Sequence, residues 1–172
     1  MKDLNLSWEL KSIKPNGFFS GYASVFNITD LHGDIIQSGA FLESLKRKQP
    51  SEIKLLWQHK TDEPIGIINS LYENEFGLCI NARLLLELKR AQEAYTLMQH
   101  NVLGGMSIGY QVKKYSYNPK LKQRIITELD LLEISLVTFP ANPQCKITNL
   151  KQAKSTVLTD SIKHAINILK QQ

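Results

Sequence analysis

Two periodicities alternate along the chain, and they predict short strands with a few helices. Residues 4–13 carry leucine or tryptophan at alternate positions, which is the period of a half-buried strand. A Pro-Asn-Gly turn follows at 15–17, and residues 19–26 are rich in aromatic and small side chains. These segments are expected to form an antiparallel hairpin, an opening typical of an all-β barrel or sandwich.

The same reasoning assigns the central part of the chain. Ser38 is expected to cap a short helix that ends before Pro50. The side chains expected to point inward from this helix are Phe41, Leu42 and Leu45. Residues 53–59 alternate again, and His59 continues an otherwise apolar face at the end of that strand. After a turn at 62–64, strands are predicted at 65–72, 78–84, 106–112 and 125–138, with a helix at 86–99.

Charge divides the chain into a body and a tail. The sequence has 172 residues and a net charge of +5. Its last thirty residues hold five lysines and one aspartate, so +4 of the +5 lies there, and residues 162–169 have the spacing of an amphipathic helix. We therefore expect a barrel domain at 1–143 and a basic segment at 144–172. A nearly neutral body without a nucleic-acid motif argues against nucleic acid as the main ligand.

Composition narrows the class further. With 42% hydrophobic residues the chain can bury a sizeable core, and no apolar run approaches the roughly 18 residues of a membrane helix. The first residues lack the continuous apolar region of a signal peptide. The two cysteines form no Cys-x-x-Cys pair, so neither a zinc knuckle nor a disulfide scaffold is indicated. A soluble protein of a reducing cytoplasm is expected.

Candidate chemistry begins with the histidines, because a serine nucleophile needs a base beside it. His32 lies in a polar loop and His100 ends a helix, where the helix dipole favours a cation, so both have structural explanations. His59 has none. Ser107 faces away from the bulky residues of its strand, although small residues beside Gly109 also suit close packing.

Three ordered segments resemble the motif series of the tailed-phage prohead maturation proteases. They are Trp-Gln-His-Lys at 57–60, Gly-Met-Ser-Ile-Gly-Tyr at 105–110, and Leu-Glu-Ile-Ser-Leu-Val-Thr-Phe-Pro-Ala-Asn-Pro at 132–143. Shorter matches upstream extend the resemblance over about residues 6–143. It implies the fold of herpesvirus assemblin, a closed antiparallel β-barrel of six or seven strands with surrounding helices. That fold agrees with the strands and helices predicted from the pattern.

The resemblance also implies the roles of individual residues. It makes Ser107 the nucleophile, His59 the general base and Glu133 the third member, where assemblin has a second histidine. Asp130 competes with Glu133, but on a regular strand the odd offset places the two carboxylates on opposite faces unless a bulge intervenes. The loop at 140–143 would supply the oxyanion donors, and because prolines have no N–H, only Ala141 and Asn142 can donate there.

For function, the resemblance implies a serine endopeptidase that cleaves scaffold and major capsid protein, and itself, inside the immature prohead in the bacterial host cytoplasm. It further implies a homodimer and requires no cofactor or metal. One alternative is a non-catalytic capsid assembly or scaffold-associated module on the same fold. Another is a metal hydrolase that uses His32, His59 and carboxylates, although no ligand spacing supports it.

Overall fold

The computed structural model describes residues 17–148, and within them eight strands form one curved sheet. The strands are β1 (Phe18–Val25), β2 (Asp34–Ile36), β3 (Lys54–Trp57), β4 (Lys60–Glu73), β5 (Gly77–Leu84), β6 (Gly105–Asn118), β7 (Gln123–Val137) and β8 (Ile147–Thr148). The helical elements of the same range are α1 (Leu42–Arg47), a 3₁₀ turn at Pro50–Glu52, and α2 (Lys89–Gln99). The mainly β class with few helices is therefore confirmed.

The sheet does not close into the antiparallel barrel that the sequence suggested. Its order is β2-β7-β3-β4-β5-β1-β8, and β6 pairs with β7 off this path. Both β2 and β3 run parallel to β7. Between β8 and β6, the described residues contain one isolated bridge, Gly105 to Lys146, flanked by bonds from Met106 N–H to Cys145 O and from Ile147 N–H to Gly104 O. With only two residues, β8 is too short to continue a ladder along β6, so the barrel stays partial.

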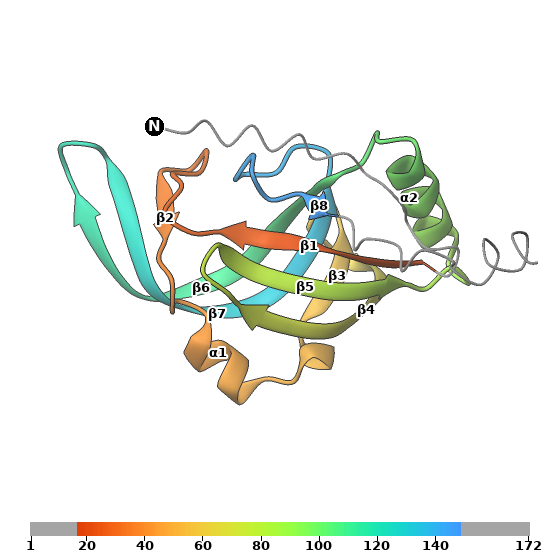
Figure 1. Cartoon of the computed structure of the whole chain (residues 1–172), viewed down its shortest axis with the longest axis horizontal. Coiled ribbons are helices and arrows are strands. Elements are labelled where there is room, and N and C mark those ends of the chain that lie inside the picture. Colours follow the sequence, from red (N-terminus) through yellow and green to blue (C-terminus); the bar gives the residue numbers. More distant parts are fainter. Residues whose placement is uncertain (1–16, 149–172) are drawn as a thin grey trace, which may run out of the picture.

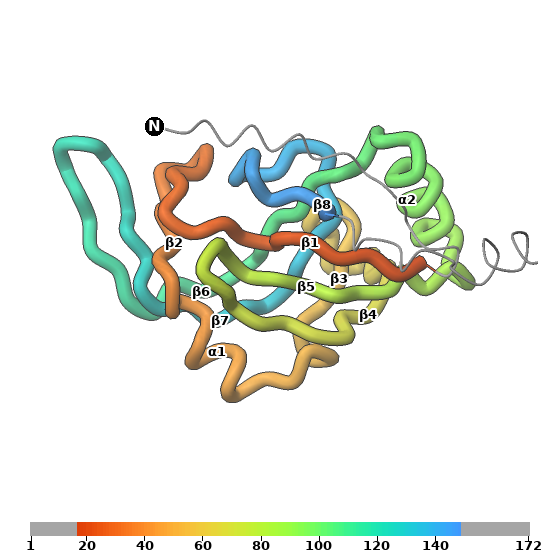
Figure 2. The backbone as a smooth tube through the Cα atoms, in the orientation of Figure 1, coloured from red at the N-terminus to blue at the C-terminus, as the bar shows by residue number. Residues whose placement is uncertain are grey.

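The long β6–β7 hairpin organises the molecule. It extends from the body as an arm, while α2 lies at the opposite end and α1 lies below the sheet (Figure 1). The tube in Figure 2 shows β1, β5 and β4 side by side, in agreement with their pairing. The base of the arm, where β7 pairs with both β6 and β3, brings residues 54–60, 105–110 and 132–138 together. These are the segments that carry the sequence motifs.

The core fills the inside of the curved sheet. Met106 is fully buried, and the other large residues on its face of β6 pack against the core, as the alternation predicted; they are Ile108, Tyr110 and Val112. Gly21 permits close approach where the barrel nearly closes, because a Cβ there would lie 2.6 Å from Met106 Cε and 2.8 Å from Ile147 Cα. A larger residue at this position would push β1 away from β8 and β6.

Two local predictions were wrong. Helix α1 begins at Leu42 without a side-chain cap, so Ser38 does not cap it, and Leu42 is 48% exposed. Phe41 and Leu45 do point inward as predicted: Leu45 packs against the core, and Phe41 is fully buried just before the helix, where the chain approaches in a turn. The turn expected at 62–64 is instead part of β4, where Pro64 pairs opposite Leu56 beside irregular register. A bulged ladder accommodates proline because it leaves an N–H position unpaired.

Some predictions concern residues outside the described range. The first strand of the N-terminal hairpin, at 4–13, and the amphipathic helix at 162–169 both lie there. Within the described range, the sheet continues past residue 143 to Thr148, because β8 pairs with β1. No helix in residues 17–148 has the length and apolar character needed to cross a membrane.

Candidate active site

His59 lies in a tight turn between β3 and β4, so its placement on an apolar strand face was wrong. Gln58 and His59 both have left-handed backbone, with φ of 51° and 60°, and Trp57 pairs with Lys60 across the turn. Two consecutive positive φ angles in a two-residue hairpin loop match a type I′ turn. Such turns favour asparagine and glycine, and for this reason the Gln-His pair gave no turn signal in the sequence.

Bonds to the end of β7 hold this turn in place. Gln58 donates its backbone N–H to Leu136 O at 3.0 Å and its side-chain amide to Thr138 Oγ1 at 2.9 Å. His59 donates its backbone N–H to Ser135 Oγ at 3.0 Å. The strained turn is therefore fixed to the strand that also carries Glu133.

Glu133 contacts the imidazole directly. Its Oε1 lies 2.6 Å from His59 Nδ1, and its Oε2 accepts a hydrogen bond from Ser135 Oγ at 2.7 Å. The Glu133 side chain is 13% exposed and that of His59 is 44% exposed. The hydrogen bond with Glu133 raises the pKa of His59, while partial burial of the ring opposes that rise. Because the carboxylate accepts a hydrogen bond from Nδ1–H, the neutral ring keeps its lone pair on Nε2.

Gly109 provides the room that the Glu133 side chain needs. The two residues are paired across β6 and β7, and a Cβ on Gly109 would lie 2.9 Å from Glu133 Cγ and 3.0 Å from its Cδ. Real Cβ atoms essentially never make contacts under 3.0 Å, so the Cγ contact would force the Glu133 side chain to move. The Ser-x-Gly pattern at 107–109 therefore serves the carboxylate on the neighbouring strand as well as local packing.

Asp130 does not approach His59. Its carboxylate accepts a hydrogen bond from Ser44 Oγ at 3.2 Å and pairs with Lys48 at 2.9 Å, and the Lys48 bond is the main cause that lowers its pKa. The register of β6 and β7 shifts between the pair Gly109–Glu133 and the next pair, Tyr110–Leu131. A bulge therefore separates the two acids. The argument that a regular strand places the two acids on opposite faces therefore does not apply. Asp130 is kept from His59 by its bonds to Ser44 and Lys48.

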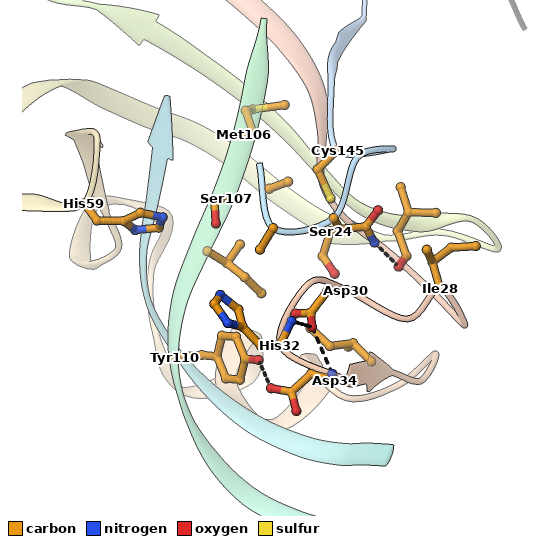
Figure 3. Close-up of a pocket in the computed structure, with 16 residues that line it drawn as sticks. Ser24, Ile28, Asp30, His32, Asp34, His59, Met106, Ser107, Tyr110 and Cys145 are labelled. Atoms are coloured by element: carbon orange, nitrogen blue, oxygen red, sulfur yellow. Dashed lines mark hydrogen bonds between the residues drawn. The ribbon is translucent and has the colours of Figure 1, made fainter. Parts of the chain in front are cut away.

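Ser107 lies on β6, opposite Ser135 of β7, and it lines a pocket of about 230 Å³ together with His59. Figure 3 shows the His59 ring pointing toward the strand that carries Ser107. No hydrogen bond joins these two described side chains. Bonds of this kind are often long in an unliganded site and tighten when substrate binds.

The loop after β7 forms another part of the pocket wall. Ala141 and Asn142 both line the pocket. The Asn142 side chain donates to Val25 O at 3.1 Å and accepts the Gln144 N–H at 3.0 Å, which fixes the loop against β1. Neither Ala141 N–H nor Asn142 N–H makes a hydrogen bond to any described residue.

The wall away from His59 rests on a buried carboxylate that the sequence patterns did not single out as a site residue. Asp34 accepts a bond from Tyr110 Oη at 2.8 Å and two bonds from Arg124 at 2.8 and 2.6 Å. Burial opposes ionisation of Asp34, but the bonds from Arg124 and Tyr110 outweigh it and lower its pKa. Burial and the bond to Asp34 raise the pKa of Tyr110. This network braces the loop 30–34, which holds Asp30 and His32 at the pocket.

The other candidate groups lack the partners that the chemistry requires. Cys145 lines the pocket, but burial raises the pKa of its thiol to about 12, so the thiolate is scarce at neutral pH. His100 is the C-cap of α2, as expected from its place at a helix end. Within residues 17–148 no three histidine, cysteine or carboxylate side chains gather as a metal site, and His59 Nδ1 is bonded to Glu133.

A serine and a histidine at one pocket, with a glutamate bonded to the histidine, are the residue types of a serine hydrolase triad. Comparison with known proteins assigns the family. The model of the caudovirus prohead serine proteases matches residues 7–159. The prohead protease of Enterobacteria phage HK97 is 42% identical over 137 residues, which cover 78% of this chain and 60% of that protein. The chain belongs to the caudovirus prohead serine protease family.

A second relative and two solved structures complete the comparison. The capsid polyprotein of Pseudomonas phage PAJU2 is 31% identical over 105 residues, 58% of this chain and 16% of that protein. The KSHV protease, solved with a hexapeptide phosphonate inhibitor, superposes with a TM-score of 0.53 at 13% identity, covering 90% of this chain and 76% of the other. The capsid assembly protease of bacteriophage T4 gives 0.53 at 10% identity, covering 70% and 82%. Both structures establish an assemblin-like fold.

Proposed function

We propose that this chain is a serine endopeptidase of phage head assembly, with Ser107 as nucleophile, His59 as general base and Glu133 as the third member. The observation that carries the proposal is the 2.6 Å contact between His59 Nδ1 and Glu133 Oε1 at the pocket that Ser107 lines. It leaves Nε2 of the imidazole to accept a proton. Membership of a serine protease family supports the same roles.

In this mechanism the Ser107 hydroxyl attacks a peptide carbonyl while His59 Nε2 takes the hydroxyl proton. Glu133 holds the ring in one tautomer and stabilises the imidazolium that forms. The imidazolium then gives its proton to the leaving amine, and an acyl group remains on Ser107. A water molecule, deprotonated by the same imidazole, hydrolyses this ester and restores the site.

The negative charge on the carbonyl oxygen needs preorganised donors. The backbone N–H groups of Ala141 and Asn142 support this role because both residues line the pocket and neither N–H is bonded to a described residue. Losing one such donor costs roughly a hundred- to a thousandfold in rate in other serine peptidases.

The proposed substrates are scaffold and major capsid protein, and the chain itself, inside the immature prohead in the host cytoplasm. The names of the relatives support this substrate class, since they include a prohead protease, a capsid polyprotein and a capsid assembly protease. The basic segment at 144–172 is the proposed recruitment element. The expected homodimer stays a prediction that light scattering on the purified chain can test.

Labelling with a fluorophosphonate, followed by peptide mapping, tests the enzyme assignment. We expect one adduct on Ser107, loss of the adduct in Ser107→Ala, and cleavage of co-expressed major capsid protein by the wild type alone. A folded protein that takes no label and leaves capsid protein intact would be the non-catalytic assembly module. An adduct on a different serine would overturn the choice of nucleophile.

A further inference from the structure

One buried hydroxyl connects the two parts of the proposed triad that come from distant segments. The Ser135 side chain accepts the backbone N–H of His59 at 3.0 Å and donates to Glu133 Oε2 at 2.7 Å. Ser135 is 0% exposed, so water has no access to replace either bond. A hydroxyl has a single proton to donate, and here it is used on the carboxylate.

Both partners of this hydroxyl need to be held. His59 has a φ of 60°, a conformation that non-glycine residues adopt only when the surroundings impose it. The carboxylate of Glu133 has one oxygen on the His59 ring and the other on Ser135, and this fixes its rotation. Without the hydroxyl, the carboxylate could turn about its last bond and the turn could shift on β7.

We propose that Ser135 is a positioning residue for peptide hydrolysis: it fixes the Glu133 carboxylate and the His59 backbone relative to each other. The inference rests on the proposed function, because it assumes that His59 and Glu133 carry out the chemistry. Ser135 does not line the pocket and acts only through its two partners. It is distinct from Ser107, although the two serines face each other across β6 and β7.

The chain contains a matched control for the loss of such a hydroxyl. Ser44 is also 0% exposed, accepts the Leu131 N–H at 2.9 Å and donates to the Asp130 carboxylate at 3.2 Å. The two serines thus make the same pair of bonds, one to a backbone N–H and one to an aspartate or glutamate. Ser44 makes them at α1, away from the pocket.

The test compares Ser135→Ala with Ser44→Ala for melting temperature, peptide turnover and the titration of His59. Both variants should lower the melting temperature by a few degrees, since each leaves a buried N–H and a carboxylate oxygen without a partner. Only Ser135→Ala should lower kcat, by roughly ten- to a hundredfold with little change in KM, because hydrogen bonds to charged groups contribute that much. Ser44→Ala should keep the wild-type kcat.

Titration of the His59 ring by NMR provides a readout that does not depend on activity. The Glu133 carboxylate of β7 is the charged partner of the ring, the neighbouring Lys60 pairs with Glu63, and the titratable groups Asp30, His32 and Asp34 line the same pocket. The Glu133 bond raises the His59 pKa, so a displaced carboxylate should let the value fall toward about 6.5 in Ser135→Ala. In Ser44→Ala the titration should match the wild type.

A double variant separates positioning from general damage. If Ser135 acts through Glu133, adding Ser135→Ala to Glu133→Gln should lower kcat by no more than a fewfold beyond Glu133→Gln alone. Equal kcat and equal His59 titration in Ser135→Ala and Ser44→Ala would overturn the inference while leaving the proposed function intact. A wild type that cleaves nothing would overturn the proposed function, and the titration would still decide whether Ser135 positions His59.

Discussion

Replacing Glu133 with glutamine is the most direct test of the third triad member, because it keeps the shape of the side chain and removes its charge. In the native protein one carboxylate oxygen lies 2.6 Å from His59 Nδ1, and Ser135 donates to the other. With Ser135 donating to the amide oxygen, the amide nitrogen faces Nδ1 and donates to it. The ring proton is then forced onto Nε2, the atom that accepts the Ser107 proton in the proposed mechanism.

The expected loss in kcat lies between about a hundredfold and about ten-thousandfold. A hydrogen bond to a charged partner contributes roughly 1.5–3 kcal/mol, a factor of about ten to a hundred in rate where the charge develops in the transition state. The wrong tautomer adds to this loss. The analogous change in a serine protease of unrelated fold costs about ten-thousandfold and sets the upper limit.

The same substitution should move the pH profile. Only neutral His59 accepts a proton, so kcat/KM rises as pH increases through the pKa of that ring. The bond with Glu133 raises the pKa, so the acid limb of the wild-type profile should lie above the ordinary value of about 6.5. In Glu133→Gln the acid limb of the kcat/KM profile should shift to lower pH, and the plateau value of kcat/KM should fall.

The assay is turnover, from pH 5 to 10, of a fluorogenic peptide that spans the cleavage site mapped on the capsid protein. Asp130→Asn is the matched control, because Asp130 bonds Ser44 and Lys48 and does not contact His59. It should lower the melting temperature and keep kcat within a fewfold of the wild type. If Asp130→Asn abolishes turnover and Glu133→Gln retains it, the assignment of the third member is wrong.

Three further predictions concern the same site. Ser107→Ala and His59→Ala should each abolish capsid cleavage, and the double variant should be no slower than either, since the residues act as one unit; a clearly slower double variant in single-turnover assays would argue against a shared mechanism. Gly109→Ala should lower kcat at least tenfold and lower the His59 pKa measured by NMR, because the new Cβ would lie 2.9 Å from Glu133 Cγ; unchanged values would refute the steric argument. The raised His59 pKa should stabilise the fold at pH below about 6.5 and stop doing so as pH rises through the folded pKa. Denaturation of wild type and Glu133→Gln at pH 5.5 and 9 should therefore show the larger stability difference at pH 5.5.

The strands were predictable from the sequence where one face is buried and the other is not. The alternation in β6 correctly placed Met106 inside, with the larger residues that follow it on the same face. The parallel pairing of β3 with β7 was not predictable, because periodicity describes one strand and says nothing of its neighbour. The partial closure depends on the two-residue strand β8, which is too short to show any period.

The sequence named the members of the candidate site, whose catalytic roles stay a prediction, and it indicated less about their geometry. The motif resemblance named Ser107, His59 and Glu133, and the structure brings the last two into contact at the pocket that the first one lines. It could not show that His59 lies in a left-handed turn, because Gln-His is not a usual type I′ pair. The bulge beside Glu133 was also hidden, since the extra residue, Leu132, is apolar and resembles a regular strand position.

The different surroundings of Glu133 and Asp130 show why the local sequence cannot decide which of the two is the third member of the proposed triad. Each carboxylate accepts a bond from a buried serine, so the immediate chemistry of the two is the same. The difference comes from what the fold brings to each: the C-cap of α1 supplies Lys48 to Asp130, whereas the turn after β3, 74 positions away in sequence, supplies the His59 imidazole to Glu133. A carboxylate neutralised by a lysine cannot also stabilise an imidazolium at another place. If the proposed triad is right, the choice of its third member depends on the β3–β7 pairing, and a variant that shifts this register should inactivate the site without changing any of its side chains.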